Sequence, residues 1–148
     1  MTSPTGKSST TVQPYLFFEG RAEEAIEFYK IALGAEVEML LRYKDSPEAP
    51  PPDKLPPGAL HKIQHASIRG GGRTISLSDG HCSGQPSFKG FAVTLVMHDS
   101  EEVARAFKAL SLGGQSVQPL IATFFSPSFG MVVDKFGVMW MLFVPKQA

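Results

Sequence analysis

The sequence predicts an α+β domain in which one β-α-β-β-β unit occurs twice and forms curved mixed sheets. A helical phrase at Ala22–Lys30 recurs at Ser100–Lys108, with Glu, an aromatic residue and Lys at matching positions. Each copy follows a short apolar run and ends at glycine, a common signal for a helix C-terminus. Helices this short are stable only when an apolar face is packed, so both should lie on sheets. We therefore expect one domain, residues 12–148, with modules at 12–79 and 90–145.

In the first module, apolar residues recur at helical spacing in one segment and at strand spacing in the others. Apolar residues recur at helical spacing from Ala22 to Leu33, and Gly34 supplies the stop. The Gly70-Gly71-Gly72 run predicts a hairpin turn, because it has neither the Walker lysine pattern nor GxGxxG spacing. The segment from Lys44 to Gly58 holds half of the 12 prolines and is expected to be a stiff connector or a lid. Strands are predicted at Val12–Phe18, Glu36–Tyr43, Leu60–Arg69 and Arg73–Ser78.

The second module follows a polar linker at Asp79–Lys89. Asp99 and Glu102 have the spacing of a capping box, which predicts the start of a helix with a buried stripe up to Leu110. Strands are predicted at Phe91–Met97, Ser116–Leu120, Phe124 to about Val133, and Val138–Val144.

The composition excludes several classes of function. Among 148 residues, 14 Lys and Arg balance 14 Asp and Glu, so no charge bias favours a nucleic-acid partner. No run is long and apolar enough to span a membrane, and the lone Cys82 excludes an intramolecular disulfide. Residues 1–11 are Ser/Thr-rich without the apolar core of a signal peptide, so we expect a disordered tail and a cytoplasmic protein.

Six short phrases of the sequence form a recognisable series: Pro14–Phe18, Ala25–Tyr29, Leu33–Glu36, Ser76–Asp79, Thr123–Phe125 and Asp134–Met141. In order and spacing they resemble the PhnB-like branch of the glyoxalase/bleomycin-resistance/dioxygenase (vicinal oxygen chelate) superfamily. The resemblance runs from about Gln13 to Lys146 and implies paired βαβββ modules, usually in a homodimer whose sheets surround the sites.

The same resemblance implies where a divalent metal would bind. Catalytic members hold it with four His, Gln or Glu side chains on facing strands. In this chain the four positions fall at Gln13 or Pro14, at Ser76, near Phe91 and at Met141. Only Gln13 offers a suitable donor, so we expect no metal and no cofactor.

His65 is the best remaining candidate for chemistry. Alternation along Lys62–Ile68 places His65 on one face with Ile63 and Ser67. On a cleft wall His65 would act as a general base or hydrogen-bond donor. The alternative is a structural histidine that a backbone group or hydroxyl satisfies.

The end of the predicted strand Arg73–Ser78 supplies further polar candidates. Ser78 is expected to face the cavity together with Ser76. Asp79 either orients a ligand or pairs with His65, or it opens the turn before Gly80.

Aromatic residues suggest a flat or apolar ligand. Tyr15, Phe124, Phe125 and Trp140, together with Phe17, are predicted to line the cleft, and the alternative is that they form core or dimer interface. Trp140 is the leading candidate for a pocket wall because it directly precedes the fourth ligand position.

Three kinds of function remain open at this level. The first is a protein that binds a small molecule without the superfamily metal. The second is a lyase, isomerase or dioxygenase-type enzyme of the same superfamily, and the third is a dimeric scaffold with an unused cleft. Members of this branch are often labelled demethylubiquinone methyltransferases, but no glycine-rich nucleotide loop follows the first predicted strand.

Overall fold

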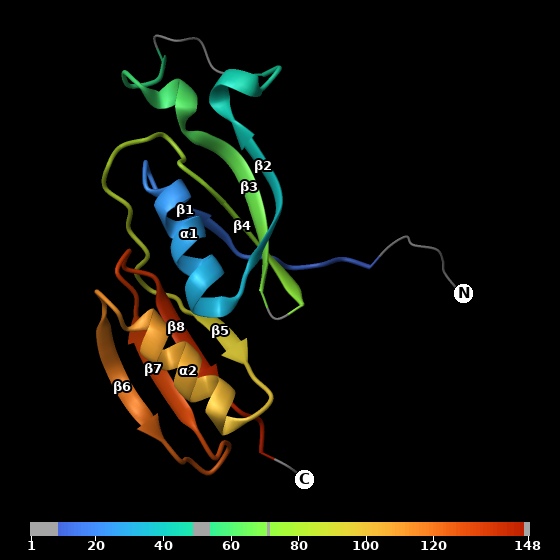
Figure 1. Ribbon diagram of the computed structural model, residues 1–148, viewed down its shortest axis with the longest axis vertical. Coiled ribbons are helices and arrows are strands. Elements are labelled where there is room, and N and C mark those ends of the chain that lie inside the picture. The colour runs from blue at the N-terminus through green and yellow to red at the C-terminus, as the bar shows by residue number, and fades with distance from the viewer. Residues whose placement is uncertain (1–8, 49–53, 71, 147–148) are drawn as a thin grey trace.

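The computed structural model describes residues 9–48, 54–70 and 72–146 (Figure 1). The predicted tail at 1–11 and the proline-rich segment at 44–58 fall partly outside these ranges. Among the described residues, neither helix is long and apolar enough to cross a bilayer. The elements of the first module are β1 (Tyr15–Phe17), α1 (Ala22–Leu33), β2 (Glu36–Arg42), β3 (Ile63–Gly70) and β4 (Arg73–Ser78).

The second module repeats the same order of elements. Its elements are β5 (Val93–Val96), α2 (Ser100–Leu110), β6 (Gln115–Ile121), β7 (Phe129–Val133) and β8 (Met139–Phe143). The strand predicted from Phe124 is wrong in extent, because residues 122–128 form a loop. The strands predicted at Val12–Phe18 and Leu60–Arg69 begin later than expected, at Tyr15 and Ile63. In that loop Ser126 Oγ accepts the amides of Ser128 and Val144, at 3.0 and 3.2 Å, so the chain turns before β7 begins.

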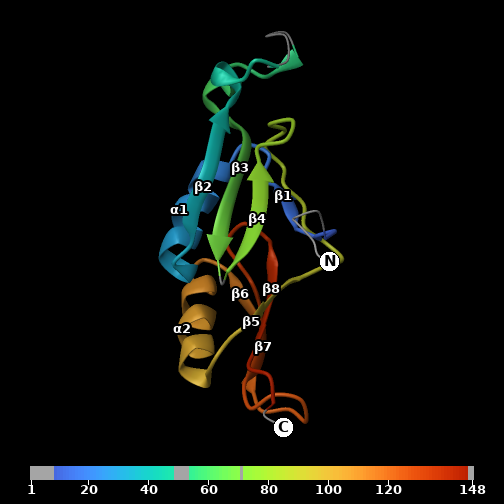
Figure 2. The same cartoon turned by 90° about the vertical axis from the view of Figure 1, so that its right-hand side faces the viewer.

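Each module forms one four-stranded sheet with the same topology. The strand orders are β1-β4-β3-β2 and β5-β8-β7-β6, and in each sheet the first pair is parallel while the others are antiparallel. Both helices lie on the same side of the molecule (Figure 2). Each sheet therefore has one face packed against a helix and one face left open. The α+β fold of paired βαβββ modules is confirmed.

The two helices start from differently built caps. Asp99 accepts the amide of Glu102 at 2.8 Å, while Glu102 accepts the amide of His98, so the predicted capping interaction is confirmed. Arg21, at the start of α1, provides no side-chain cap. Asp79 takes that role from the end of β4, where its Oδ1 accepts the amides of Gly20 and Ala22 at 2.9 and 2.8 Å. At its other end α1 stops at Gly34, which has a left-handed φ of 66°.

A single core joins the modules through aromatic side chains. Phe18 contacts both Phe88 of the linker and Phe136 of the β7–β8 turn, with ring centroids 5.1 and 5.7 Å apart. Tyr29 of α1 packs on Trp140 of β8 at 5.4 Å. Because these contacts link α1 to the second module, burial of apolar area stabilises the arrangement of the two modules as well as each module.

Asp134 is the polar centre of this junction. It is buried, and its carboxylate accepts hydrogen bonds from the Tyr29 hydroxyl at 2.6 Å and from Trp140 Nε1 at 2.8 Å. The backbone amides of Phe136 and Val138 also donate to the Asp134 carboxylate. Burial, together with the Asp134 charge, raises the pKa of the Tyr29 hydroxyl well above its ordinary value.

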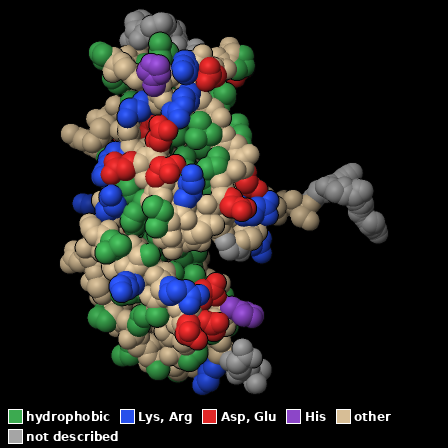
Figure 3. Space-filling model, viewed as in Figure 1, with side chains coloured by type: hydrophobic (Ala, Val, Ile, Leu, Met, Phe, Trp, Pro, Cys, Tyr) green, Lys and Arg blue, Asp and Glu red, His purple; other side chains and the backbone are tan. Residues whose placement is uncertain are grey.

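The helix side of the molecule carries charges of both signs. Figure 3 shows acidic and basic side chains next to one another over the first module. Arg21 and Lys135 both form ion pairs with Glu24. Such exposed pairs contribute little stability, typically less than about 1 kcal/mol each. The helix side as drawn has no extended patch of one sign.

Candidate functional site

The open face of the first sheet carries polar and aromatic side chains. Leu16, Ala66, Ile68, Ile75 and Leu77 are buried in the core, so their strand neighbours point to the other side of the sheet. We call this surface the polar face. It comprises Tyr15 and Phe17 of β1, Thr74, Ser76 and Ser78 of β4, and His65 and Ser67 of β3.

Tyr15 and His65 interact directly on the polar face. The Tyr15 hydroxyl lies 3.0 Å from His65 Nδ1, and the two ring centroids are 5.5 Å apart. Phe17 extends the aromatic surface, with its ring 4.9 Å from that of Tyr15. Tyr15 and Phe17 remain 40% and 52% exposed, so both rings are available for contact. The structure therefore brings together two of the predicted binding residues, His65 and Tyr15.

Two serines lie beneath this aromatic layer. Ser78 is 2% exposed, and its Oγ accepts the amide of Gly80 at 3.1 Å. Ser76 is 8% exposed, and its hydroxyl makes no hydrogen bond to any described residue. A buried hydroxyl normally has a partner, so Ser76 offers an unsatisfied polar group at the centre of the polar face.

Asp79 belongs to the fold rather than to the polar face. Besides capping α1, it accepts the amide of Ile63 on Oδ2 at 2.7 Å, and it is fully buried. Both carboxylate oxygens are thus occupied by backbone donors, while the partner of His65 is Tyr15. The interpretation of Asp79 as a turn residue describes its position at Gly80, but spacing along the chain gave no sign of the α1 cap.

The open face of the second sheet is apolar. Val132, Trp140 and Leu142 are fully buried beneath the helices, so the residues that alternate with them face outward. We call this surface the apolar face. It consists mainly of Val96 of β5, Phe129 and Met131 of β7, and Met141 and Phe143 of β8, together with Phe125 from the preceding loop. Thr94 of β5, in register with Met141, adds one hydroxyl to it.

Phe124 and Phe125 lie at the edge of the apolar face. The ring of Phe125 contacts those of Phe129 and Phe143, with centroids 5.3 and 5.9 Å apart. Phe124 contacts Phe125 and is 86% exposed. These two aromatic residues therefore extend the apolar face outward into solvent.

Trp140 lies away from both open faces. It is fully buried on the helix side of the second sheet, where it contacts Tyr29 and Asp134. Hence the structure does not bring Trp140 and His65 together. Alternation along β8 provides the reason, because a residue next to Met141 must point to the opposite side of the strand. Met131, Phe129 and Phe143 reach the apolar face by the same rule, and sequence reasoning did not single them out.

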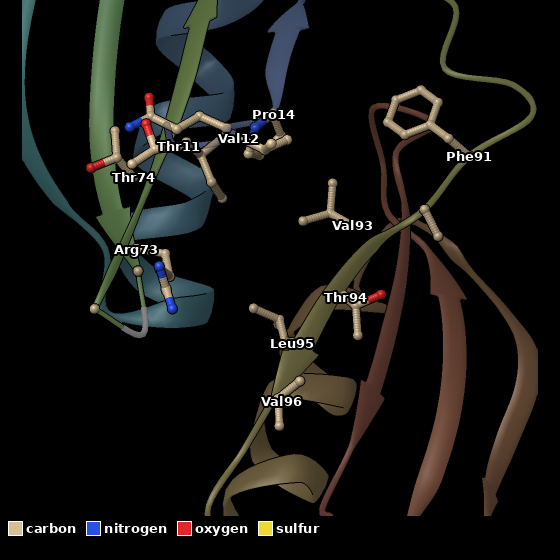
Figure 4. Close-up of a pocket in the computed structure, with 15 residues that line it drawn as sticks. Thr11, Val12, Pro14, Arg73, Thr74, Phe91, Val93, Thr94, Leu95 and Val96 are labelled. Carbon is tan, nitrogen blue, oxygen red and sulfur yellow. The ribbon is translucent and has the colours of Figure 1, made fainter. Parts of the chain in front are cut away.

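A groove of about 810 Å³ separates the two modules at β5. One wall is formed by Thr11–Pro14 and by the start of β4, and the other wall is formed by Phe91–Val96. Figure 4 shows Val93 and Leu95 projecting from β5 toward the opposite wall. Because Tyr15 directly follows Pro14, β1 forms the boundary between this groove and the polar face.

The superfamily metal does not fit the residues at its four expected positions. Gln13, Pro14 and Phe91 line the groove, whereas Ser76 lies on the polar face and Met141 on the apolar face. One amide, one hydroxyl and one thioether make a poor donor set for Ni, Zn, Fe or Mn. Within the described ranges no cluster of three or more His, Cys, Asp or Glu side chains could replace them.

Cys82 has the environment of an unreactive thiol. It is partly buried in the linker, and burial, reinforced by the nearby Asp79 carboxylate, raises the pKa of its thiol. A catalytic cysteine requires the opposite shift, so Cys82 contributes no nucleophile to the site.

The fold and its two open faces define the class of protein: this is a member of the glyoxalase/bleomycin-resistance/dioxygenase superfamily, in its PhnB-like branch. A model of the family described as 3-demethylubiquinone-9 3-methyltransferase matches residues 10–143, so the chain belongs to that family. Solved structures below 25% identity, such as the fosfomycin resistance protein FosX from Listeria monocytogenes, share the fold alone.

Three relatives resemble the chain over nearly its whole length. Protein YjdN of Escherichia coli is 38% identical over 143 residues, which cover 92% of this chain and 96% of YjdN. Protein PA1353 from Pseudomonas aeruginosa is 36% identical with a TM-score of 0.80, covering 94% of this chain and all of that one. A putative 3-demethylubiquinone-9 3-methyltransferase, the PhnB protein from Bacillus cereus, is 27% identical with a TM-score of 0.72, and the coverages are 91% and 99%.

Proposed function

We propose that this protein binds a small molecule on the polar face, without the superfamily metal, in the cytoplasm. The observation that carries the proposal is the exposed aromatic pair of Tyr15 and Phe17 beside the polar groups of His65 and Ser76. Exposed apolar surface with a few convergent polar groups is typical of a ligand site. The groove across β1 extends this surface.

The functional unit of this proposal is a homodimer. On the apolar face and its edge, Val96, Ile121 and Phe125 are 61%, 52% and 38% exposed. A contiguous exposed apolar surface of this kind is typical of a protein–protein interface. In this dimer a second copy packs against the apolar face. The same copy supplies the wall of the ligand cleft that lies opposite the polar face. The proposal therefore predicts that a substitution which weakens self-association also weakens ligand binding.

A ligand screen by thermal shift tests the binding function. A ligand at a hundredfold excess over its Kd stabilises the protein by roughly 2.7 kcal/mol, which is a readily measured shift in Tm. We expect flat aromatic compounds to raise the Tm of the wild type and to lose that effect in Phe17→Ser. A screen in which hits are unaffected by Phe17→Ser and by His65→Ala would place the ligand elsewhere.

Elemental analysis tests the metal-free part. We expect less than stoichiometric divalent metal in the purified protein, and no glyoxalase activity when Ni²⁺ or Zn²⁺ is added. About one tightly bound transition metal per subunit would overturn this part of the proposal.

A metal-free lyase or isomerase is the second candidate function, because a hydrogen-bonded Tyr–His pair is suited to proton transfer. It differs from simple binding in one measurable respect. His65→Ala would then abolish turnover of a bound compound and leave much of its affinity, whereas a binding protein shows no turnover to lose.

Methyl transfer, which the family description names, needs a site for a methyl donor. In this chain the connection from β1 to α1 carries a single glycine, Gly20, and the amides of Gly20 and Ala22 are taken by Asp79. That helix N-terminus is therefore closed to an external anion. We expect no heat of binding when S-adenosylmethionine is titrated into the protein, and a micromolar Kd would favour the methyltransferase.

A further inference from the structure

We propose that Tyr15 holds His65 in the tautomer that carries its proton on Nε2, so that His65 selects a planar aromatic ligand bearing a neutral oxygen acceptor such as a carbonyl. The inference rests on the proposed binding function of the polar face and adds the chemical class of its ligand. It makes His65 the specificity-determining donor and Tyr15 the residue that positions it.

The strand order brings these two residues together in an unusual way. Strand β4 lies between β1 and β3, so the Tyr15 and His65 backbones are two strand spacings apart, roughly 10 Å. Tyr15 is in register with Ser76, and Ser76 is in register with Ser67. Because the intervening side chains are serines, the tyrosine and histidine rings can meet above them. Larger residues on β4 would hold the two rings apart.

The direction of the hydrogen bond follows from the chemistry of the two groups. An imidazole nitrogen is a better acceptor than a phenol oxygen, and a phenol hydroxyl is a good donor. The stronger arrangement has Tyr15 donating to Nδ1, across the observed 3.0 Å. A neutral imidazole whose Nδ1 accepts carries its only hydrogen on Nε2. No described residue lies within hydrogen-bonding distance of Nε2, so that donor remains for a ligand.

Ser76 independently indicates a missing hydrogen-bonding group. Its hydroxyl is more than nine-tenths buried, lies on the same face and lacks a partner among the described residues. A ligand oxygen, or a water that such an oxygen holds, would satisfy it at the same time as the Nε2–H of His65. Two converging donors of this kind suit an oxygen acceptor.

On the polar face itself the charges indicate a neutral acceptor rather than an anion, whereas the cationic Arg73 lines the neighbouring groove. Arg69 is the charged residue that follows His65 and Ser67 in the alternation along β3. Its guanidinium is already bound to Glu38, which also accepts the hydroxyl of Thr74 at 2.9 Å. The exposed rings of Tyr15 and Phe17 provide the surface on which an aromatic ligand stacks.

Two probes of nearly equal size test the inference. We would titrate the full-length protein with 2-acetylnaphthalene, which has a carbonyl acceptor, and with 2-ethylnaphthalene, which has none. We expect the wild type to bind the acetyl compound about tenfold more tightly. This preference should disappear in His65→Ala and fall by several-fold in Tyr15→Phe, which keeps the stacking ring. His98→Ala, which removes an exposed histidine just before α2 and outside the groove, serves as the matched control and should keep the tenfold preference.

The histidine tautomer gives a readout that a merely structural role would not change. The ¹⁵N shifts of His65, assigned by their loss in His65→Ala, should show a protonated Nε2 in the wild type and a tautomer mixture in Tyr15→Phe. Equal affinity for both probes, or a predominant Nδ1–H tautomer in the wild type, would overturn the inference and leave the binding function intact. If the wild type binds neither probe, both the proposed function and this inference fail.

Discussion

The two modules have the same strand order and the same helix position, yet their open faces differ in chemistry. The open face of the first module carries serines, a histidine and two exposed aromatic rings, whereas that of the second carries methionine, valine and phenylalanine side chains. The backbone topology therefore sets where a surface lies, and the residues at alternate strand positions set what that surface can bind. One face supplies hydrogen-bonding groups, and the other supplies apolar area.

The modules also differ in how they secure their helices. Helix α2 is capped by Asp99, the residue immediately before it, while α1 depends on Asp79, which lies at the far end of the module. A local cap stabilises one helix turn. A distant cap ties the helix to the end of β4 and to the start of β3, so its loss should affect the whole module.

Exchanging each cap for alanine gives the largest expected effect. Asp79→Ala leaves three backbone donors, the amides of Gly20, Ala22 and Ile63, without their acceptor. At about 1–3 kcal/mol per unsatisfied buried group, we expect a loss of at least about 3 kcal/mol in the free energy of unfolding. Asp99→Ala should cost about 1 kcal/mol.

Urea unfolding followed by circular dichroism measures both losses. If Asp79→Ala is too unstable to purify, Asp79→Asn, which keeps one acceptor oxygen, should lie between the alanine variant and the wild type. Equal losses for the two alanine variants would show that the distant cap acts only locally.

The second-largest expected effect is the loss of stability at the junction between the modules. Tyr29→Phe removes a buried hydrogen bond to the Asp134 carboxylate and should cost about 1.5–3 kcal/mol. Tyr43→Phe is the matched control, because Tyr43 donates to an uncharged carbonyl, that of Gly80, and should cost only about 1 kcal/mol. If thermal or urea unfolding finds the reverse order, Asp134 does not provide the main polar link.

The raised pKa of Tyr29 also predicts a dependence on pH. In the unfolded chain this hydroxyl ionises near its ordinary value of 10.0, whereas in the folded protein burial and Asp134 keep it protonated to higher pH. The folded state then binds more protons, so stability is fully present below about pH 10 and falls as pH rises above it. In urea unfolding at several pH values, Tyr29→Phe should show a smaller alkaline loss than the wild type.

The difference between the two open faces predicts a smaller effect on self-association. Phe125→Ser removes an aromatic ring from the apolar face and should weaken dimerisation by about tenfold, because burying a ring of this size is worth about 1.5–3 kcal/mol. Leu112→Ser is the control, since Leu112 is similarly apolar and 65% exposed but lies beyond the end of α2. Sedimentation equilibrium measures both; equal weakening would mean that the apolar face is not the interface.

The smallest expected effect concerns the reactivity of Cys82 in the linker between the modules. Because burial and Asp79 raise the pKa of the Cys82 thiol, iodoacetamide at pH 7.5 should alkylate it several-fold more slowly than it alkylates glutathione. The same chain in 8 M urea should react at the rate of a free thiol. A folded protein that reacts as fast as glutathione would contradict the assigned environment.

The elements of the fold were largely predictable from local patterns. Helical periodicity, the Asp99–Glu102 cap and the stop at Gly34 are local signals, and each corresponds to a feature of the structure. The strand predicted from Phe124 was wrong in extent because apolar residues alone do not distinguish a strand from a loop that packs on one. There the hydrogen bonds of Ser126 decide the outcome.

The site was predictable only in part. Alternation along β3 correctly joined His65 and Ser67 on one face, but Ile63, predicted to lie with them, is fully buried in the core. No pattern in the sequence paired His65 with Tyr15. That pairing depends on a parallel β1–β4 register and on small residues between the two strands. For Trp140, strand alternation would have indicated the helix side, whereas its position next to Met141 suggested the cleft.

By itself the sequence determined the duplicated βαβββ unit and the lack of a suitable donor at three of the four metal positions, because periodicity and residue chemistry are local properties. The tertiary structure alone decided that Asp79 caps a helix 57 residues away, that Asp134 joins the modules and that Tyr15 meets His65 above two serines. Those contacts depend on strand order and register, which arise only when distant segments pack together. The opposing character of the two open faces emerges from the same packing.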